Sequence, residues 1–115
     1  MRPELTALVR LLCSQLHKAS RLCVLVVPPA VEQQTGGPGM FGQDDFAHLA
    51  PHLDYFSLMT YDYSSVGRPG PNSPLEWAEE CVVKLDPDSR YRSKILLGLN
   101  MYGYSYTAQV MYVRQ

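Results

Sequence analysis

The sequence predicts an α/β fold with about three parallel strands and intervening helices. Three apolar runs, at residues 22–27, 55–61 and 94–100, are typical of strands, and the first and third lack the alternation of a half-exposed strand. Segments with helical periodicity precede and separate them. The runs begin roughly 33 and 39 residues apart, which suits successive βαβ units with right-handed crossovers.

The predicted helices follow from apolar spacing and from proline positions. From Pro3 to about Ala19, leucines and valine recur every three or four residues, and Pro3 suits a first helical turn. A short helix is expected at about residues 43–49, with two acids near its start, and another from Pro74 to about Lys84. Residues 28–42 and 64–73 are rich in Gly, Pro and polar residues and are predicted loops.

Three parallel strands are fewer than a doubly wound sheet or a closed barrel contains, and both outer strands would have unpaired edges. We therefore expect residues 1–115 to be one segment of a larger domain, with a divergent tail at residues 107–115. Such a segment is expected to have little stability by itself.

The composition limits the classes of partner. The formal net charge is −1 and basic residues form no long run, so the sequence indicates neither nucleic acid nor an anionic membrane surface as a partner. We expect no membrane span and no cleavable leader, because charged residues interrupt the apolar N-terminal stretch.

The cysteines and histidines are predicted to have structural roles. Cys13, Cys23 and Cys81 are an odd number at wide spacing, which favours buried thiols over a disulfide framework or a metal site. The three histidines are scattered, so no metal or other cofactor is predicted. Trp77 shares a helix face with Cys81 and is predicted to pack in the core. The basic residues near Asp86 and Asp88 are predicted to form a solvated turn.

The best candidate for a ligand site is the end of the second strand. Tyr61 and Asp62 come where this strand breaks into a loop, and the carboxyl ends of parallel strands are where ligands bind in α/β proteins. A phenol and a carboxylate there could serve one ligand, although Asp is also common at strand exits as a turn residue. Alternation places the two side chains on opposite faces, so a bend would be needed to bring both to one ligand.

Two motifs resemble glycoside hydrolase family 18, the family of the chitinases. Residues 57–63, Ser-Leu-Met-Thr-Tyr-Asp-Tyr, are similar to its strand-six signature, and residues 94–103, Lys-Ile-Leu-Leu-Gly-Leu-Asn-Met-Tyr-Gly, are similar to its strand-seven segment. The resemblance implies a partial (β/α)8 TIM barrel containing strands five to seven. Within the family, residues 69–77 and 86–94 are most similar to a group of chitinase-like saccharide binders of the lysosomal and secretory route.

The resemblance also implies roles for individual residues. Tyr61 would steady a sugar acetamido group, Asp62 would accept hydrogen bonds from the sugar, and Met59 would line the floor of that subsite. Tyr102 would face the cleft, and Asn100 stands where many members have proline. Tyr104 stands where many chitinases have arginine. These departures leave the substrate contact at this edge open.

The resemblance leaves catalysis to residues outside these motifs. The family's proton donor is the Glu ending an Asp-x-x-Asp-x-Asp-x-Glu motif, which does not occur in the sequence, so no catalytic residue is predicted and the chain is expected not to hydrolyse glycans. Tyr61 and Asp62 would be auxiliary.

Three functions remain open. The first is carbohydrate binding, to chitooligosaccharide or a related glycan such as lipopolysaccharide, with a stabilin-type sorting receptor as a further partner implied by the resemblance. The others are a piece of an active chitinase and a non-functional truncation. The resemblance implies a lysosomal or secreted location.

Overall fold

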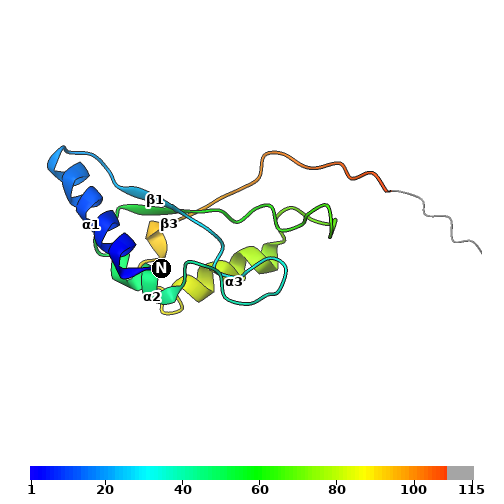
Figure 1. The fold of residues 1–115 in the computed structure, drawn as a ribbon, viewed down its shortest axis with the longest axis horizontal. Helices are drawn as coiled ribbons and strands as arrows, with labels where there is room; N and C mark the ends of the chain where they lie inside the picture. The colour runs from blue at the N-terminus through cyan, green and yellow to red at the C-terminus, as the bar shows by residue number, and fades with distance from the viewer. Residues whose placement is uncertain (109–115) are drawn as a thin grey trace, which may run out of the picture.

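The computed structural model describes residues 1–108 and confirms the α/β class (Figure 1). The elements in chain order are α1 (Pro3–Lys18), β1 (Val24–Val27), α2 (Gln43–Leu49), β2 (Tyr55–Leu58), α3 (Leu75–Leu85), the 3₁₀ helix η1 (Arg92–Lys94) and β3 (Ile95–Leu97). The three strands form one parallel sheet in the order β1-β2-β3, with helices in the connections. This arrangement is consistent with part of a (β/α)8 barrel. Most of the tail predicted at residues 107–115 lies outside the described residues.

The strands are shorter than the apolar runs that predicted them. β1 begins at Val24 rather than Leu22, and β3 ends at Leu97 rather than Asn100. At the end of β3 the carbonyl of Gly98 accepts a hydrogen bond from the Thr60 hydroxyl at 2.9 Å, so a side chain takes the place of a backbone partner.

The core lies between the sheet and its helices, and Phe56 of β2 is at its centre. The Phe56 side chain is fully buried, and its ring centroid lies 4.7 Å from that of Phe46 in α2 and 6.0 Å from that of Phe41. Leu49 and Leu58 are equally buried. Each such side chain stabilises the fold by roughly 1.5–3 kcal/mol relative to exposure. Tertiary burial therefore stabilises α2, which at seven residues is too short to form alone.

Trp77 is a core residue, as predicted. Its side chain is 4% exposed, and the indole N–H donates to the carbonyl of Val31 at 2.9 Å. The ring also lies 5.0 Å from the ring of Tyr63, between centroids. Because Tyr63 follows Tyr61 and Asp62 directly, this contact anchors α3 to the loop that leaves β2.

The opposite face of the sheet is open to solvent. Val26 of β1, Ser57 of β2 and Leu96 of β3 lie in register across it. Val26 is 59% exposed and Leu96 45%. Parallel sheets are normally covered on both faces. The described residues therefore leave an apolar sheet face without a covering layer.

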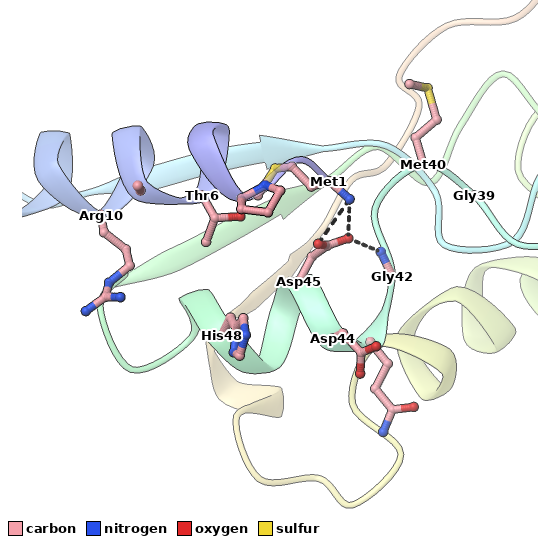
Figure 2. A pocket seen from close by; sticks show the side chains of 12 residues that line it. Met1, Thr6, Arg10, Gly39, Met40, Gly42, Asp44, Asp45 and His48 are labelled. Carbon is pink, nitrogen blue, oxygen red and sulfur yellow. Dashed lines mark hydrogen bonds and ion pairs between the residues drawn. The ribbon is translucent and has the colours of Figure 1, made fainter.

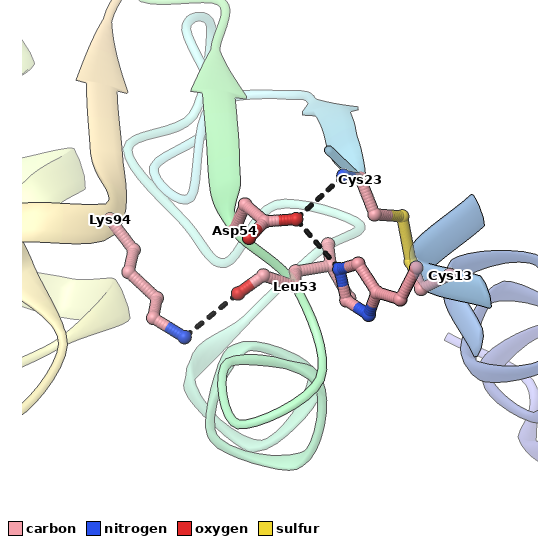
Figure 3. The surroundings of a disulfide bond; sticks show 6 residues. Cys13, Cys23, Leu53, Asp54 and Lys94 are labelled. Carbon is pink, nitrogen blue, oxygen red and sulfur yellow. Dashed lines mark hydrogen bonds and ion pairs between the residues drawn. A yellow bond between two sulfur atoms is a disulfide. The ribbon is translucent and has the colours of Figure 1, made fainter. Parts of the chain in front are cut away.

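The prediction of three buried thiols is wrong for two of them. Cys13 of α1 and Cys23, just before β1, form a disulfide with 5.2 Å between their Cα atoms (Figure 3). Wide spacing in a sequence does not measure distance in space, because the helix C-terminus and the following turn bring the two positions together. Cys81 is buried as a free thiol, and burial raises its pKa.

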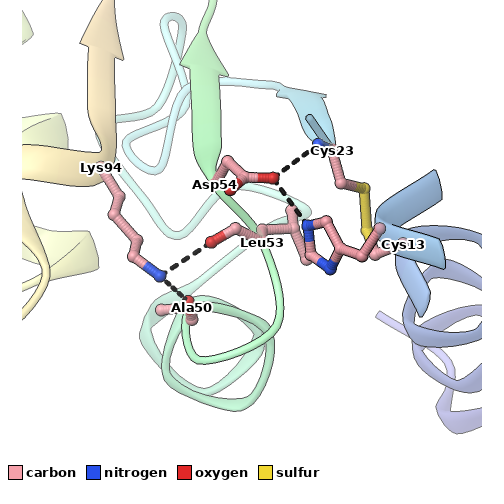
Figure 4. Close-up of polar contacts among 7 residues, drawn as sticks. Cys13, Cys23, Ala50, Leu53, Asp54 and Lys94 are labelled. Carbon is pink, nitrogen blue, oxygen red and sulfur yellow. Dashed lines mark hydrogen bonds and ion pairs between the residues drawn. A yellow bond between two sulfur atoms is a disulfide. The ribbon is translucent and has the colours of Figure 1, made fainter. Parts of the chain in front are cut away.

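The turn after α3 is solvated only in part: Asp88 and Arg90 are exposed, as predicted, whereas Asp86 is not. The Asp86 carboxylate is buried and accepts from the backbone N–H groups of Arg90 and Tyr91, each at 3.1 Å. The Lys94 ammonium donates to the carbonyls of Ala50 at 2.7 Å and Leu53 at 2.8 Å, just after α2 (Figure 4). A cation suits these carbonyls at a helix C-terminus. Lys94 thus ties the start of β3 to α2.

Within residues 1–108, no helix combines the length and the apolar character needed to cross a membrane. In the same part of the chain, no three metal-ligating side chains come together into a cluster.

Candidate functional site

The exits of β2 and β3 lie side by side because the strands pair in parallel register, with Leu58 opposite Leu97. Gly98 makes this close approach possible. A Cβ atom at position 98 would lie 2.4 Å from the Leu58 carbonyl oxygen and 2.8 Å from the Tyr61 ring. Only glycine fits at these distances. Gly98 thereby lets the Tyr61 ring lie across the end of β3.

The structure brings Asp62, Tyr61 and Tyr102 together. The Tyr102 hydroxyl donates to the Asp62 carboxylate, with 2.5 Å between Oη and Oδ1. The rings of Tyr61 and Tyr102 meet edge to face, at 6.4 Å between centroids and an interplanar angle of 75°. Such edge-to-face pairs are favourable because of the ring quadrupoles. The predicted site residues of two strand exits therefore form one cluster.

Asp62 has the bend that the alternation argument required. Its φ is +59°, in the left-handed region. Thr60, which strand alternation would place on the same face as Asp62, is fully buried. The left-handed turn brings the Asp62 carboxylate toward Tyr102, away from the direction that strand alternation would give it. Asp62 is exposed, and Tyr61 is half-buried.

The other two predicted site residues do not touch this carboxylate. The amide group of Asn100 donates to the backbone carbonyl of Tyr102 at 2.8 Å, so it shapes the segment that carries the tyrosine. Met59 is half-buried, and its backbone N–H continues the strand ladder by donating to the Val27 carbonyl at 3.0 Å. The role of Met59 as a subsite floor stays a prediction.

A comparison with models of protein families identifies the family of this chain. The family model of Glycosyl hydrolases family 18 matches residues 2–113. The chain belongs to glycosyl hydrolase family 18. Family membership implies a carbohydrate ligand, and it agrees with a sheet of parallel strands whose carboxyl ends carry the polar residues.

The electrostatics of this cluster keep the Tyr102 hydroxyl a hydrogen-bond donor. The pKa of its phenol is raised to about 12, chiefly because the hydroxyl donates to the Asp62 carboxylate, with burial and the negative charge of Asp62 adding to the effect. Tyr102 therefore keeps its proton at any physiological pH. Its hydroxyl therefore remains available to donate to Asp62.

The cluster is suited to a polyhydroxylated ligand. Asp62 Oδ1 accepts from Tyr102 and from Asn72, while Oδ2 has no partner within residues 1–108. A free carboxylate oxygen can accept from a sugar hydroxyl or amide, and the tyrosine rings offer apolar faces to sugar C–H groups. Sugars present both kinds of group.

Asn72 and Gly98 are parts of this region that the sequence interpretation did not assign to the site, and it noted Tyr104 only as a departure from the family pattern. Asn72 contacts Asp62 from a loop that composition marks only as flexible, so no sequence signal singles it out. The Tyr104 ring lies 5.5 Å from that of Tyr102, and Tyr106 continues the row at 6.5 Å, between centroids. The alternation of tyrosines at 102, 104 and 106 was the signal for this row.

Several hollows lie elsewhere on residues 1–108 of this family 18 chain, and two of them lie at the start of α1. One of about 750 Å³ lies between α1 and the start of α2, where the Asp45 carboxylate pairs with the N-terminal ammonium at 3.2 Å and accepts from the Gly42 N–H at 3.0 Å (Figure 2). The other, of about 790 Å³, has a largely apolar wall between α1 and β1. Neither hollow has Tyr61, Asp62 or Tyr102 in its wall. The site is therefore an exposed rim of polar and aromatic groups at the sheet edge.

Proposed function

We propose that this chain is a carbohydrate-binding part of a chitinase-like protein, with chitooligosaccharide or a related amino-sugar glycan as ligand. The observation that carries the proposal is the bond from Tyr102 to Asp62 at 2.5 Å, with the Tyr61 ring beside it. Two strand exits that are 40 residues apart in sequence thus present a carboxylate, a phenol and aromatic faces at one place. Tyr61, Asp62 and Tyr102 would contact the sugar.

The test is a titration of the folded chain with chitotetraose, in which NMR chemical shifts report binding. Circular dichroism with helix and strand bands establishes first that the chain is folded, which separates this proposal from a non-functional truncation. Asp62→Ala should weaken chitotetraose binding by about 10- to 100-fold, the effect of losing a hydrogen bond to a charged group. Asp88→Ala removes another exposed acid, beyond α3, and should leave binding unchanged. Equal affinity of wild type and Asp62→Ala, or a folded wild type that does not bind, would refute the proposal.

The chain is further proposed not to hydrolyse its ligand. The Asp-x-x-Asp-x-Asp-x-Glu motif that supplies the family's proton donor does not occur in the sequence. A positioned general acid contributes about 10²–10⁴ in rate, and without that motif no residue is assigned to this role. Turnover of a fluorogenic chitobioside by the purified chain would instead favour the alternative, an active family 18 chitinase.

Residues 69–77 and 86–94 support a finer assignment, to a group resembling chitinase domain-containing protein 1, also called stabilin-1-interacting chitinase-like protein. For this group the proposed glycans include lipopolysaccharide, the proposed location is lysosomal or secreted, and the proposed partner is a stabilin-type sorting receptor. The Cys13–Cys23 disulfide supports the location, because disulfides persist in oxidising compartments. A cross-linked Cys13–Cys23 peptide in protein from the secretory route, by mass spectrometry, is the expected result. Reduced thiols there would contradict it.

A further inference from the structure

Asn72 makes three of the hydrogen bonds at the exit of β2. Its side-chain Oδ1 accepts from the Asp62 backbone N–H at 3.1 Å, and its Nδ2 donates to Asp62 Oδ1 at 3.3 Å. Its backbone carbonyl accepts from the N–H of Tyr63 at 2.8 Å. One half-buried side chain, ten residues along the chain, therefore holds both the backbone and the carboxylate of Asp62.

The Asn72 bonds stabilise the left-handed conformation of Asp62, which Asp adopts more readily than most residues do. A residue other than glycine in the left-handed region is uncommon and persists where the surroundings hold it there. The Asn72 amide contacts Asp62 on both sides of the φ torsion, at the backbone nitrogen and through the side chain. This pair of bonds fixes the bend and the direction of the carboxylate together.

The direction of the carboxylate determines which oxygen a ligand meets. Oδ1 is taken by Asn72 and Tyr102, which approach it from different segments, so the carboxylate cannot rotate without losing a bond. Oδ2 is then the oxygen left toward solvent within residues 1–108. Asn72 itself is held by its neighbour, because the Ser73 hydroxyl donates to the Thr60 carbonyl at 2.5 Å.

We propose that Asn72 is a positioning residue of the sugar site, which holds Asp62 so that Oδ1 stays with Tyr102 and Oδ2 is presented to the ligand. The inference rests on the proposed function for the identity of the ligand. Its first readout needs no sugar, so the two proposals can fail separately.

The first experiment compares Asn72→Ala with Ser64→Ala by NMR of ¹³Cζ-labelled tyrosine, with Tyr102 assigned from Tyr102→Phe. The Ser64 hydroxyl donates to the Pro71 carbonyl at 2.7 Å, so Ser64→Ala loosens the same loop without removing a contact to Asp62. In Asn72→Ala the pKa of Tyr102 should fall from about 12 toward its ordinary value near 10, because the Asp62 carboxylate is no longer held against the phenol. In Ser64→Ala it should stay raised.

The direction of the change separates positioning from a simple contact. The Asn72 side chain also acts on the phenol directly and by itself lowers the pKa of Tyr102. Loss of that effect alone would raise the pKa of Tyr102 further. An unchanged or higher pKa of Tyr102 in Asn72→Ala would overturn the inference, and so would an equal fall in Ser64→Ala.

A second variant, Asn72→Asp, has the same shape and keeps the acceptor for the Asp62 N–H. If Asn72 lies against Asp62 in solution, the two carboxyls of this variant should titrate as a coupled pair, with one pKa well above the ordinary range near 4. Carboxyls that titrate independently would refute the contact. This variant provides the test even if Asn72→Ala does not fold.

The last measurement is the affinity of each variant for chitotetraose. Chitotetraose binding should weaken by about 3- to 10-fold in Asn72→Ala, as expected for loss of a neutral hydrogen bond that orients the acceptor. Ser64→Ala should bind as wild type does. Full affinity in Asn72→Ala, with a shifted Tyr102 titration, would overturn the role in ligand presentation. A wild-type chain that does not bind chitotetraose would refute the proposed function, while the two titrations would still decide whether Asn72 positions Asp62.

Discussion

Asp54 directly precedes β2 and Asp62 lies in the segment that leaves it, and the partners of the two carboxylates differ in kind. The Asp54 carboxylate accepts from the backbone N–H of Cys23 at 2.7 Å and lies 2.7 Å from the His17 ring, beside the Cys13–Cys23 disulfide (Figures 3 and 4). These contacts join β2 to β1 and α1. The Asp62 carboxylate instead accepts from Tyr102 and Asn72, which belong to loops that follow the strands.

The difference separates the contacts that stabilise the sheet from those of the proposed binding site along one strand. At the amino end of the sheet, a covalent bond, a carboxylate and the Lys94 ammonium tie helices to strands. At the carboxyl end, a loop side chain holds an exposed acid in a left-handed conformation. In barrels of this kind the amino-terminal face serves stability and the carboxyl-terminal face serves function. Changes at one end should therefore leave the other end unaffected.

The largest effect is expected from removing the disulfide. The double variant Cys13→Ser, Cys23→Ser should lower the free energy of unfolding by about 2–4 kcal/mol, because the unfolded chain gains conformational freedom. Urea unfolding measures the loss of free energy, and wild-type protein treated with dithiothreitol should show the same loss as the double variant. The Tyr102 titration in the folded protein should not change. A shift there would contradict the separation of the two ends.

Gly98→Ala tests the carboxyl end. The added methyl group would meet the Leu58 carbonyl oxygen at 2.4 Å and the Tyr61 ring at 2.8 Å, so backbone and ring must both move. We expect a loss of about 1–3 kcal/mol in the free energy of unfolding, as for overpacked positions, together with weaker chitotetraose binding. Gly103→Ala is the matched control, because nothing lies within 4 Å of a Cβ atom there. Equal stability of the two variants would show that the strand exits are not closely packed.

Tyr102→Phe should reduce chitotetraose affinity by about 3- to 10-fold, since Asp62 loses a donor that orients it. It also gives a pH signature. Because the folded pKa of Tyr102, about 12, lies above its ordinary value near 10, the bond stabilises the fold below pH 10. That stabilisation is lost as the pH rises through the folded pKa. Tyr102→Phe should lack this alkaline component of the unfolding profile, and an identical profile in both proteins would contradict it.

The smallest effect is expected at Asp54. The Cys23 N–H first, and then His17, hold the pKa of this carboxyl below its ordinary value. A lowered pKa contributes stability that is present above the unfolded pKa, near 3.9, and lost as the pH falls through the folded value. Asp54→Asn should flatten the acid side of the stability profile between about pH 5 and pH 2, measured by thermal unfolding. Sugar binding at neutral pH should not change. An unaltered acid profile would show that the contact contributes no stability.

Much of the fold was predictable because it depends on local patterns. Apolar periodicity predicted α1, α2 and α3 to within a residue or two, and uninterrupted apolar runs predicted the parallel strands. The burial of Trp77 followed from its place on the same helix face as Cys81. The second strand exit also identified Tyr61 and Asp62, because ligands bind where parallel strands end. Tyr102 was identified only through the resemblance to family 18.

The amino-acid sequence by itself thus determined which segments form helices and strands and which residues emerge at the edge of the sheet. Only the tertiary structure decided the partners: Cys23 for Cys13, Ala50 and Leu53 for Lys94, and Asn72 for Asp62. The physical reason is that periodicity specifies the direction of a side chain relative to its own element. Which groups then meet depends on how turns such as the left-handed one at Asp62 redirect the chain.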